Sequence, residues 1–534
     1  MIRSTKGRIG LMTVLIVLFL QPIFIFGGGR AEQPAVRDEV DFSQPFDVPI
    51  TWYLRAGIAD TEDSDAVNER LNEVLAERGF NVGVQIEFIN RPDYADRMSL
   101  VNTAGEQYDL ALVTEAWFNQ YPQNVENEFL TALSHYVHPT SGETVDLLQE
   151  FTPGLWASMP EGGWDAARVD GVIYAIPNQQ IWVRPFGVSI RRDVMEALNL
   201  QADIDALENW ADLTPILQTV QDAIDDGSLA GQVADGQNLR RAFATADLVK
   251  TENARMDPIG PAGMVVRIDD DDLQVESFFF TDEFEDLVRI RRDWQVRGLT
   301  TPDLLDPQEQ IAGYSAGQYA VDVGRLVKPG GDLEQAARMG YSWYEHPIAP
   351  AFIDTGGPTA TMTGISSTIE NNYGRLRAVL QFMEYVHTDQ EIYNLIAKGI
   401  EGRHWEWVDE DAQLIRNLED SRYRPNIDWA IGNQFNAFYI DPDQVGAWPE
   451  TLELNQSAIS SPALGFRFDS SSVQTEVAAI QSITGEYLDP LNDGQASNMD
   501  AAIAEFRRQL TSAGINDLLR EAQRQIDAWQ AEMQ

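Results

Sequence analysis

The 534-residue chain contains no cysteine. It therefore cannot form disulfides, use a thiolate nucleophile or build a zinc site on cysteine ligands. It also has no cysteine near the N-terminus that could carry a lipid anchor. Any catalytic nucleophile, metal site or membrane tether of this protein must be built from other side chains.

Basic residues are scarce as well. The chain has 38 Lys and Arg against 84 Asp and Glu, for a formal net charge of −46, and only four of the basic residues are lysines. Such a surface repels phosphate backbones and anionic membranes, so we expect no nucleic-acid partner. The acids are spread along the chain, which favours a solubility or saline-habitat interpretation over a cationic substrate.

Long apolar runs are confined to the N-terminus. Three basic residues precede the apolar run 11–26, which is followed by mostly small residues at 27–31. This pattern predicts a secretory signal peptide over residues 1–31. Gln21 and Pro22 interrupt the run, which therefore falls short of the ~20 apolar residues of a spanning helix. We expect cleavage near Gly27 to Ala31 rather than a retained anchor.

The polar segment 32–45 is predicted to be a linker, because it contains Pro34 and Pro45 and no apolar periodicity. The mature chain is then expected outside the cytoplasm. It would be periplasmic or at the outer face of the cytoplasmic membrane, and not lipidated through cysteine.

A strand–helix alternation begins after the linker. Strand-like segments at 48–54, 82–89 and 108–113 alternate with helical periodicity at 65–78 and 91–103. This order predicts a parallel α/β sheet, and the length of the chain predicts at least two lobes. Ligands of open α/β sheets bind at the carboxyl ends of the strands, which here carry Arg55, Glu115 and Trp117.

A second series of elements follows. We predict strands at 170–177 and 186–190, helices at 193–200, 209–224 and 281–297, a helix end leading into a strand at 313–323, two helices within 371–398, and one long amphipathic C-terminal helix over 500–531.

No catalytic or nucleotide-binding motif is present. The chain lacks a G-x-S-x-G elbow, a P-loop and a dinucleotide-binding glycine loop, and it has five histidines. His135 and His138 have i,i+3 spacing but no third metal ligand nearby. The acidic run Asp269 to Asp272 lacks the spacing of a calcium-binding loop, so we interpret it as an exposed turn. We expect no cofactor and no metal. Catalysis by a pair of carboxylates remains an alternative, because the chain is so rich in acidic residues.

Aromatic residues are the positive signal. The chain has 13 Trp and 16 Tyr, and several tryptophans lie in polar, glycine-containing loops, among them Trp117, Trp182 and Trp429. Sugars present C–H faces that stack on rings and hydroxyls that bind polar side chains, so such loops favour a carbohydrate ligand. For any single tryptophan, packing in a core is the commoner role.

The order of short motifs resembles that of extracellular solute-binding proteins of ABC importers, of the family 1 sugar-binding lipoprotein type. The motifs are Asp170–Pro177 with Gly187–Asp193, Ser315–Ala320, Gly364–Ser367, Gly399–Trp405, Gly432–Asn436, Ser461–Phe466, Ala513–Asn516 and Glu521–Trp529. Gly27 to Gly29 stand where many of these proteins carry the lipidated cysteine.

The resemblance implies a two-lobed clamshell of α/β class, each lobe a β-sheet flanked by helices, with discontinuous lobes joined by a hinge. We place lobe one at 46–176 plus 356–400 and lobe two at 177–355 plus 401–532. The expected function is capture of a carbohydrate, such as an oligosaccharide, between the lobes and its delivery to the ABC permease transmembrane subunits by a monomeric binding protein.

The ligand is expected to contact residues of the strand ends, the loop aromatics and the interlobe segments: Arg55, Glu115, Trp117, Gln179, Trp182, Arg325, His404 and Trp429. Arg55, Arg184 or Arg325 could receive a uronic acid carboxylate, although an ion pair between the lobes is the preferred interpretation. A peptide- or polyol-binding protein of the same fold and a secreted carboxylate-pair hydrolase remain the alternatives.

The stretch KGIEGRHWEW, residues 398–407, concentrates two tryptophans and a histidine. In an extended segment Trp405 and Trp407 share one face, and His404 and Glu406 share the other. We interpret the tryptophan pair as packing within a lobe, after a helix that ends at Lys398-Gly399, and place the stretch where the chain re-enters lobe two.

Overall fold

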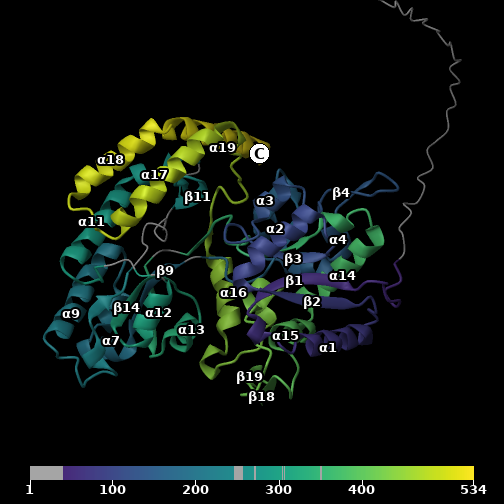
Figure 1. The fold of residues 1–534 in the computed structure, drawn as a ribbon, viewed down its shortest axis with the longest axis horizontal. Helices are drawn as coiled ribbons and strands as arrows, with labels where there is room; N and C mark the ends of the chain where they lie inside the picture. The colour runs from purple at the N-terminus through teal and green to yellow at the C-terminus, as the bar shows by residue number, and fades with distance from the viewer. Residues whose placement is uncertain are drawn as a thin grey trace, which may run out of the picture. The chain divides into compact units, whose positions relative to one another are not determined.

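A five-stranded sheet organises the first lobe (Figure 1). Its order is β2-β1-β3-β17-β8, formed by β2 (Val84–Asn90), β1 (Ile50–Ala56), β3 (Leu110–Val113), β17 (Met362–Ile365) and β8 (Ala175–Pro177). β1 pairs in parallel with β2 and β3, as the strand–helix alternation predicts, while β17 runs antiparallel to β3 and β8. The structure, a computed structural model, describes residues 40–183, 185–245, 256–269, 272–302, 305, 307–348 and 351–533.

Four predictions fall wholly or partly on other residues. The signal peptide, residues 32–39 of the linker, Arg184 and the middle of the Asp269–Asp272 turn lie outside the described residues. The described residues from 40 onward belong to one compact unit, Asp38–Gln534. No helix in the described part of the chain is long and apolar enough to span a bilayer.

Side-chain amides tie the first helices to the sheet. α1 (Ser64–Glu77) carries Asn68, whose amide donates to the carbonyl of Ile86 and accepts from its N–H, at 3.0 and 2.9 Å. Asn72 does the same with Val84. These bonds satisfy the backbone of β2 at the edge of the sheet, where no further strand of the described residues pairs with it.

The return of the chain to the first lobe is fixed by a buried ion pair. α14 (Tyr373–Thr388) carries Arg375, which binds the carboxylate of Asp109 and the carbonyls of Val48 and Pro49. α15 (Gln390–Lys398) follows directly and ends at Gly399 as predicted. The other short elements of this lobe are α2 (Tyr94–Ala104), α3 (Tyr121–Glu126), β4 (Tyr136–Val137), β5 (Thr144–Val145), α4 (Leu147–Phe151), α5 (Pro153–Ser158), α6 (Gly163–Ala166), β6 (Arg168–Val169) and β7 (Val172–Ile173).

The second lobe is built on a mixed four-stranded sheet. Its order is β10-β14-β9-β15, from β10 (Arg241–Phe243), β14 (Tyr319–Leu326), β9 (Phe186–Arg191) and β15 (Trp343–Pro347). The helices are α7 (Arg192–Leu198), α8 (Gln201–Asp205), α9 (Leu213–Asp225), α11 (Asp282–Val296), α12 (Pro307–Ser315) and α13 (Gly331–Met339). A smaller antiparallel sheet contains β11 (Met256–Gly260), β12 (Met264–Arg267) and β13 (Glu276–Ser277).

The C-terminal region differs from the single long helix predicted over 500–531. It forms α17 (Gln474–Asn492), α18 (Met499–Ser512) and α19 (Ile515–Met533), which pack on one another and on α11 (Figure 1). The break falls at Gly514, whose φ of +94° suits glycine and ends the helical run. Amphipathic periodicity continues on both sides of the break, so periodicity alone did not reveal it.

The described residues form two large, separate hydrophobic cores. The first core contains side chains of 50–182 and 362–397 and also Tyr423, Ile427, Ala430, Ile431 and Ala437. The second contains residues of 188–348 and 463–526. Residues 423–437, which we assigned to lobe two, therefore pack in the first core, and the tyrosine hydroxyl of Tyr423 donates to the carbonyl of Ile396 at 2.8 Å.

Three chain segments cross between the cores. Residues 178–186, 348–361 and 458–469 connect them, and β16 (Phe352–Ile353) pairs in parallel with β20 (Ile459–Ser460). α16 (Ala447–Ser457) and the hairpin of β18 (Trp405–Asp409) and β19 (Leu414–Asn417) complete the fold. Residues Trp405–Asp409 are extended, which is the condition under which Trp405 and Trp407 share one face.

Candidate ligand-binding site

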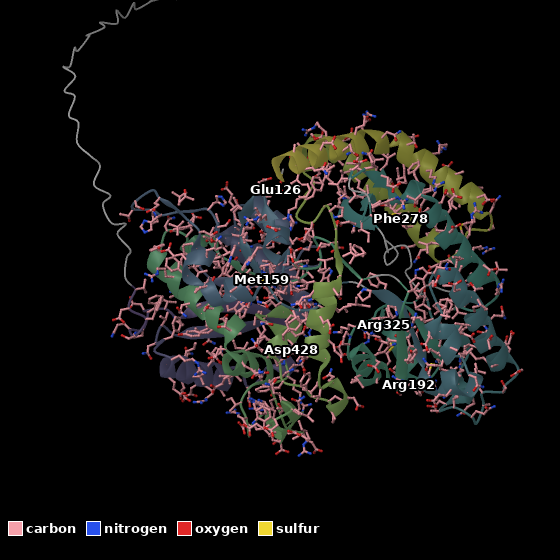
Figure 2. The ribbon with its side chains drawn as sticks, turned by 180° about the vertical axis from the view of Figure 1, so that it is seen from behind. Glu126, Met159, Arg192, Phe278, Arg325 and Asp428 are labelled. Atoms are coloured by element: carbon pink, nitrogen blue, oxygen red, sulfur yellow. The ribbon has the colours of Figure 1, made fainter. Side chains whose placement is uncertain are left out.

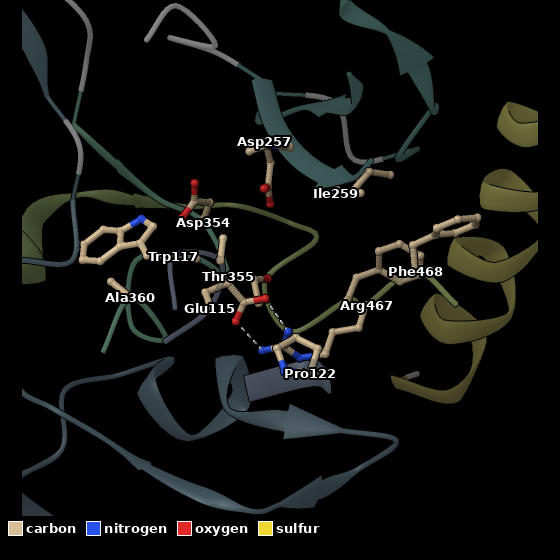
Figure 3. A pocket seen from close by; sticks show the side chains of 15 residues that line it. Glu115, Trp117, Pro122, Asp257, Ile259, Asp354, Thr355, Ala360, Arg467 and Phe468 are labelled. Carbon is tan, nitrogen blue, oxygen red and sulfur yellow. Dashed lines mark hydrogen bonds and ion pairs between the residues drawn. The ribbon is translucent and has the colours of Figure 1, made fainter. Parts of the chain in front are cut away.

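A pocket of about 370 Å³ lies between the end of β3, the second lobe and two of the crossing segments (Figure 3). Its walls come from four stretches of chain that are far apart in sequence. They are Glu115, Ala116, Trp117 and Pro122; Asp257 to Gly260; Asp354, Thr355, Gly356 and Ala360; and Phe466 to Phe468. The carboxyl end of a sheet strand thus contributes to a ligand-sized hollow, as the topology predicted.

The turn after β3 is fixed by Thr114. Its hydroxyl oxygen accepts from the backbone N–H of Trp117 at 3.3 Å and of Phe118 at 3.1 Å, and the hydroxyl donates to the carbonyl of Phe118. The turn therefore holds Trp117 outward, and the Trp117 residue is 63% exposed. An exposed tryptophan on a rigid turn is a ready stacking surface.

A second tryptophan stands beside it. The ring centroids of Trp117 and Trp429 are 6.2 Å apart, and their planes are inclined by 55°. The indole N–H of Trp429 donates to the carbonyl of Asn426 at 3.1 Å, and its own carbonyl accepts from the Thr361 hydroxyl at 2.8 Å. The two rings therefore form an aromatic corner whose positions are set by the backbone around them.

Glu115 is held by an arginine from a crossing segment. Arg467 forms a bidentate ion pair with Glu115, at 2.6 Å for Nη1–Oε1 and 3.1 Å for Nη2–Oε2 (Figure 3). Arg467 also donates to the carbonyls of Ala166 and Arg168, and its guanidinium lies 5.3 Å from the ring centroid of Tyr121. A bidentate pair of this kind is strong and directional, so Arg467 fixes the segment 461–469 on the first lobe.

Asp257, Asp354 and Thr355 add oxygen atoms to the pocket, and Phe466 and Phe468 add rings. The sequence analysis did not single out any of these five residues as a ligand contact. They come from the crossing segments and from β11, where no local pattern marks a ligand contact. The motif Ser461–Phe466, used for the family resemblance, does end at the pocket wall, which is the one signal that pointed there.

Arg55 lies near this region without lining the pocket. Its Nε donates to the carbonyl of Arg91 at 3.1 Å, and its guanidinium lies 4.6 Å from the ring centroid of Phe118. Partial burial, with the neighbouring charge of Arg91, lowers the pKa of Arg55. Arg55 thus packs on Phe118 and supports the turn that carries Trp117.

Gln179 and Trp182 are buried in the first crossing segment. The amide of Gln179 donates to the hydroxyl of Ser158, and its backbone bonds to Gly432 and Gln434. Trp182 is 1% exposed, its indole N–H donates to the carbonyl of Asn178, and its backbone N–H donates to the amide oxygen of Asn455. Both residues join the crossing segment to the first lobe, and neither lines the pocket.

His404 lies in a buried ionic cluster outside the pocket. Its Nε2 is 3.2 Å from Asp63 Oδ2, and its Nδ1 accepts from the backbone N–H of Ile400 at 2.8 Å. Burial lowers the pKa of His404, against the opposing effect of Asp63. Burial alone would raise the pKa of Asp63, but hydrogen bonds from His404 and Arg403, together with the charges of Arg403 and Arg422, hold it below its ordinary value.

This cluster corrects the position given to KGIEGRHWEW. Asp63 precedes α1 in the first lobe, and Arg403, His404 and Arg422 all contact it. The stretch therefore belongs to the first lobe and does not mark re-entry into the second.

Arg325 lies on β14 in the second lobe (Figure 2) and is not among the residues that line the pocket. Its Nε is 3.4 Å from Asp322 Oδ2. Burial raises the pKa of Asp322, although Arg325 and Arg338 oppose this rise. Arg325 is thus an ion-pair partner within its own lobe. Of the eight predicted residues, Glu115 and Trp117 line the pocket, and Trp429 contacts Trp117 without lining it.

The histidine pair of the sequence analysis has other partners. Nδ1 of His138 accepts from the backbone N–H groups of Thr140 and Ser141 at 3.2 Å, and His135 bonds the hydroxyl of Ser134. Within the described ranges, no group of three or more His, Asp or Glu side chains has metal-site geometry. The pocket itself combines aromatic rings with carboxylate and hydroxyl oxygen atoms. This arrangement is suited to binding a polar ligand with flat apolar faces.

Known proteins are similar to this chain along most of its length. A family model described as "Domain of unknown function (DUF3502)" matches residues 462–531. A protein of Streptococcus pneumoniae serotype 4 named "Carbohydrate ABC transporter substrate-binding protein" is 20% identical over 480 residues, covering 88% of this chain and 89% of that protein.

Solved structures are similar as well. The N-glycan transport solute binding protein NgtS of Streptococcus pneumoniae matches with a TM-score of 0.72 at 18% identity, covering 91% of this chain and all of that one. A solute binding protein of Bifidobacterium longum infantis, described as HMO binding and ABC-transporter associated, matches with a TM-score of 0.62 at 15% identity, over 91% and 99% of the two chains. The two-lobed solute-binding fold and the resemblance to carbohydrate substrate-binding proteins are confirmed.

Proposed function

We propose that this protein is the extracytoplasmic substrate-binding subunit of an ABC importer and that it captures a carbohydrate in the pocket between its lobes. The observation that carries the proposal is the aromatic corner of Trp117 and Trp429 beside Glu115, Asp257 and Asp354. Sugar rings can stack on the exposed indole while their hydroxyls donate to the carboxylates. The carbohydrate is expected to be an oligosaccharide.

The relatives support the same class of ligand. NgtS has been solved with Man1GlcNAc and with Man5GlcNAc, and a pneumococcal binding protein, FusA, with kestose. These sugars differ in their units, so the relatives favour a glycan without selecting one. We propose Glu115, Trp117 and Trp429 as ligand contacts. We assign structural roles outside the pocket to Arg55, Gln179, Trp182, Arg325 and His404.

In this proposal no covalent bond is made or broken. A ligand that contacts both lobes shifts the population toward the closed form, because only that form offers all contacts. The closed, loaded monomer would then dock on the permease transmembrane subunits. Export through the N-terminal signal would place it outside the cytoplasm, without lipidation through cysteine.

A thermal-shift screen against sugars, peptides and polyols tests the proposal. We expect one oligosaccharide class to raise the melting temperature by mass action, and the sugar to be recovered intact after long incubation. Trp117→Ala should weaken that response, whereas Leu100→Ala, at another exposed apolar side chain on α2, should leave it unchanged.

Two results would reject the proposal in different ways. A shift with peptides or polyols alone would keep the fold-based function and change the ligand. Cleavage of a sugar that disappears in Asp257→Asn or Asp354→Asn would instead support the secreted hydrolase.

A further inference from the structure

A second hollow, of about 620 Å³, lies on the first lobe away from the interlobe pocket, with which it shares no residue. It is formed by α1, α15, the turn after α15 and the β18–β19 hairpin. Its walls are Arg70, Val74, Gln390, Glu391, Asn394, Leu395, Gly399 to Gly402, Trp405, Trp407, Glu410 and Phe438. All of these residues belong to the first lobe or to segments packed on it, so the hollow does not depend on how the lobes close.

Three rings form one wall of this hollow. The centroids of Trp405 and Trp407 are 5.0 Å apart, those of Trp407 and Phe438 4.7 Å, and those of Trp405 and Phe438 5.5 Å. Rings in mutual contact leave no space between them for an ammonium group, so the cluster is not an aromatic cage. It offers a continuous apolar face on which a flat ligand can lie.

The two tryptophans have different roles within this wall. Trp405 is buried, and its indole N–H donates to the carbonyl of Gly399 at 2.9 Å. Trp407 is half-exposed, and its indole N–H has no hydrogen-bond partner among the described residues. Trp405 therefore anchors the wall, and Trp407 presents both a ring and a free donor to the hollow.

The backbone around the wall is fixed before any ligand arrives. Asn394 donates to the carbonyls of Gln390 and Asn436 and accepts from the N–H of Phe438 at 2.8 Å. A Cβ at Gly399, whose φ is +84°, would come within 2.3 Å of the His404 ring, so only glycine fits this turn. A rigid wall lowers the conformational cost of binding.

The rim of the hollow is acidic. Glu401 and Glu410 are exposed, and neither side chain has an ion-pair partner among the described residues. Arg70, the cation in the lining, pairs with Glu73 at 2.8 Å and Glu77 at 3.8 Å. Phosphates, sulfates and uronates would therefore be repelled, while neutral hydroxyl groups could donate to the two free carboxylates.

We propose that this hollow is a second carbohydrate subsite, which binds neutral saccharides on Trp407 and Phe438 independently of the interlobe pocket. One partly exposed ring offers a single stacking surface, so the subsite is weak and tolerant of sugar identity. Its effect would be to hold glycans near the protein without driving closure of the lobes.

Saturation-transfer NMR with four neutral oligosaccharides (maltohexaose, cellohexaose, mannopentaose and kestose) tests this proposal on the full chain. The Trp117→Ala variant removes the main interlobe stacking surface. We expect at least one sugar to retain binding to this variant and to bind about fivefold more weakly when Trp407→Ala is added. Trp407→Phe, which keeps a ring, should restore most of the signal.

Arg416→Ala is the matched control, because Arg416 pairs with Glu406 on the opposite face of the same hairpin. It should leave the residual signal unchanged. Equal residual binding with and without Trp407, no residual binding of any sugar, or preferential binding of spermidine would each overturn the proposal. If the NMR signal depends on Trp407 while no sugar raises the melting temperature, the second subsite is supported and the proposed interlobe function fails.

Discussion

Two loop segments of the first lobe carried the same sequence signal and have opposite environments. The turn 114–118 and the crossing segment 178–183 each place a tryptophan among polar residues outside an apolar periodic run. Trp117 is 63% exposed, whereas Trp182 is 1% exposed. Both segments lack regular secondary structure. The difference in tryptophan exposure therefore comes from the residues that surround each backbone.

Hydrogen bonding explains the contrast. The turn at Trp117 is closed by the neighbouring Thr114, which leaves the indole without a protein acceptor among the described residues. Trp182 is tied at its backbone to Asn455 and at its indole to Asn178. Trp182, bound through its indole and its backbone, is therefore part of the core, whereas the exposed ring of Trp117 is available for a ligand.

Replacing Trp182 with Ala should give the largest effect. Truncation of a buried tryptophan costs about 3–5 kcal/mol of unfolding free energy, because a cavity replaces its contacts. Urea unfolding measures this loss. The sugar affinity of the protein that remains folded should be close to that of the unchanged chain.

The reverse pattern would break the comparison. If Trp182→Ala folds with near-normal stability and loses sugar affinity, Trp182 reaches the ligand in the closed form. Trp117→Ala is the paired variant, and its unfolding free energy should stay within about 0.5 kcal/mol of the original.

The buried side of the comparison includes a histidine. His387 lies in α14, and its two buried ring nitrogens have no hydrogen-bond partner among the described residues. Burial lowers the pKa of His387 to about 3. The unfolded chain takes up a proton near the ordinary value of 6.5, so the stability is full above pH 6.5 and falls as the pH drops toward 3. The loss is about 1.4 kcal/mol per pH unit, or ~3 kcal/mol by about pH 4.

His387→Leu should flatten this acid dependence of the urea midpoint between about pH 6 and 4. His135→Gln, at an exposed histidine, is the matched control and should keep the dependence of the unchanged chain. A His387→Leu curve that still falls as steeply over this range would show that other groups set the acid sensitivity.

Much of the fold could be predicted from the sequence because periodicity reports local structure. The strands around Trp52, Ile86 and Leu112 and the helices α1 and α11 were placed to within a few residues. The break at Gly514 and the packing of Tyr423 on the first core were missed, since both depend on tertiary contacts rather than on periodicity.

The site was predicted in part for the same reason. Glu115 and Trp117 follow from their place after a sheet strand, but the same rule also selected Arg55, which does not line the pocket. Asp257, Asp354 and Phe468 reach the pocket from other parts of the chain, and nothing in their own sequence neighbourhoods marks a ligand. His404 was selected for its residue type, but its partner Asp63 is 341 positions away.

The Glu115–Arg467 ion pair tests what holds the exposed Trp117 in place, because it fixes the base of the turn that carries Trp117. Both side chains are largely buried, with 24% and 15% exposure. A double-mutant cycle with Glu115→Gln and Arg467→Met should give a coupling energy of about 1.5–3 kcal/mol in urea unfolding. Arg507→Met, which breaks a pair confined to the second lobe, should show no coupling to Glu115→Gln.

Trp117→Ala should have the smallest effect, and only on binding. The exposed ring contributes little to folding, but loss of one stacking surface should reduce sugar affinity by about 1 kcal/mol, roughly fivefold. Calorimetric titration at constant temperature measures the change, and Trp117→Phe should recover part of it because a smaller ring still stacks. If both variants bind sugar as tightly as the unchanged chain, the exposure of Trp117 has no bearing on the ligand, and the contrast with Trp182 is one of packing alone.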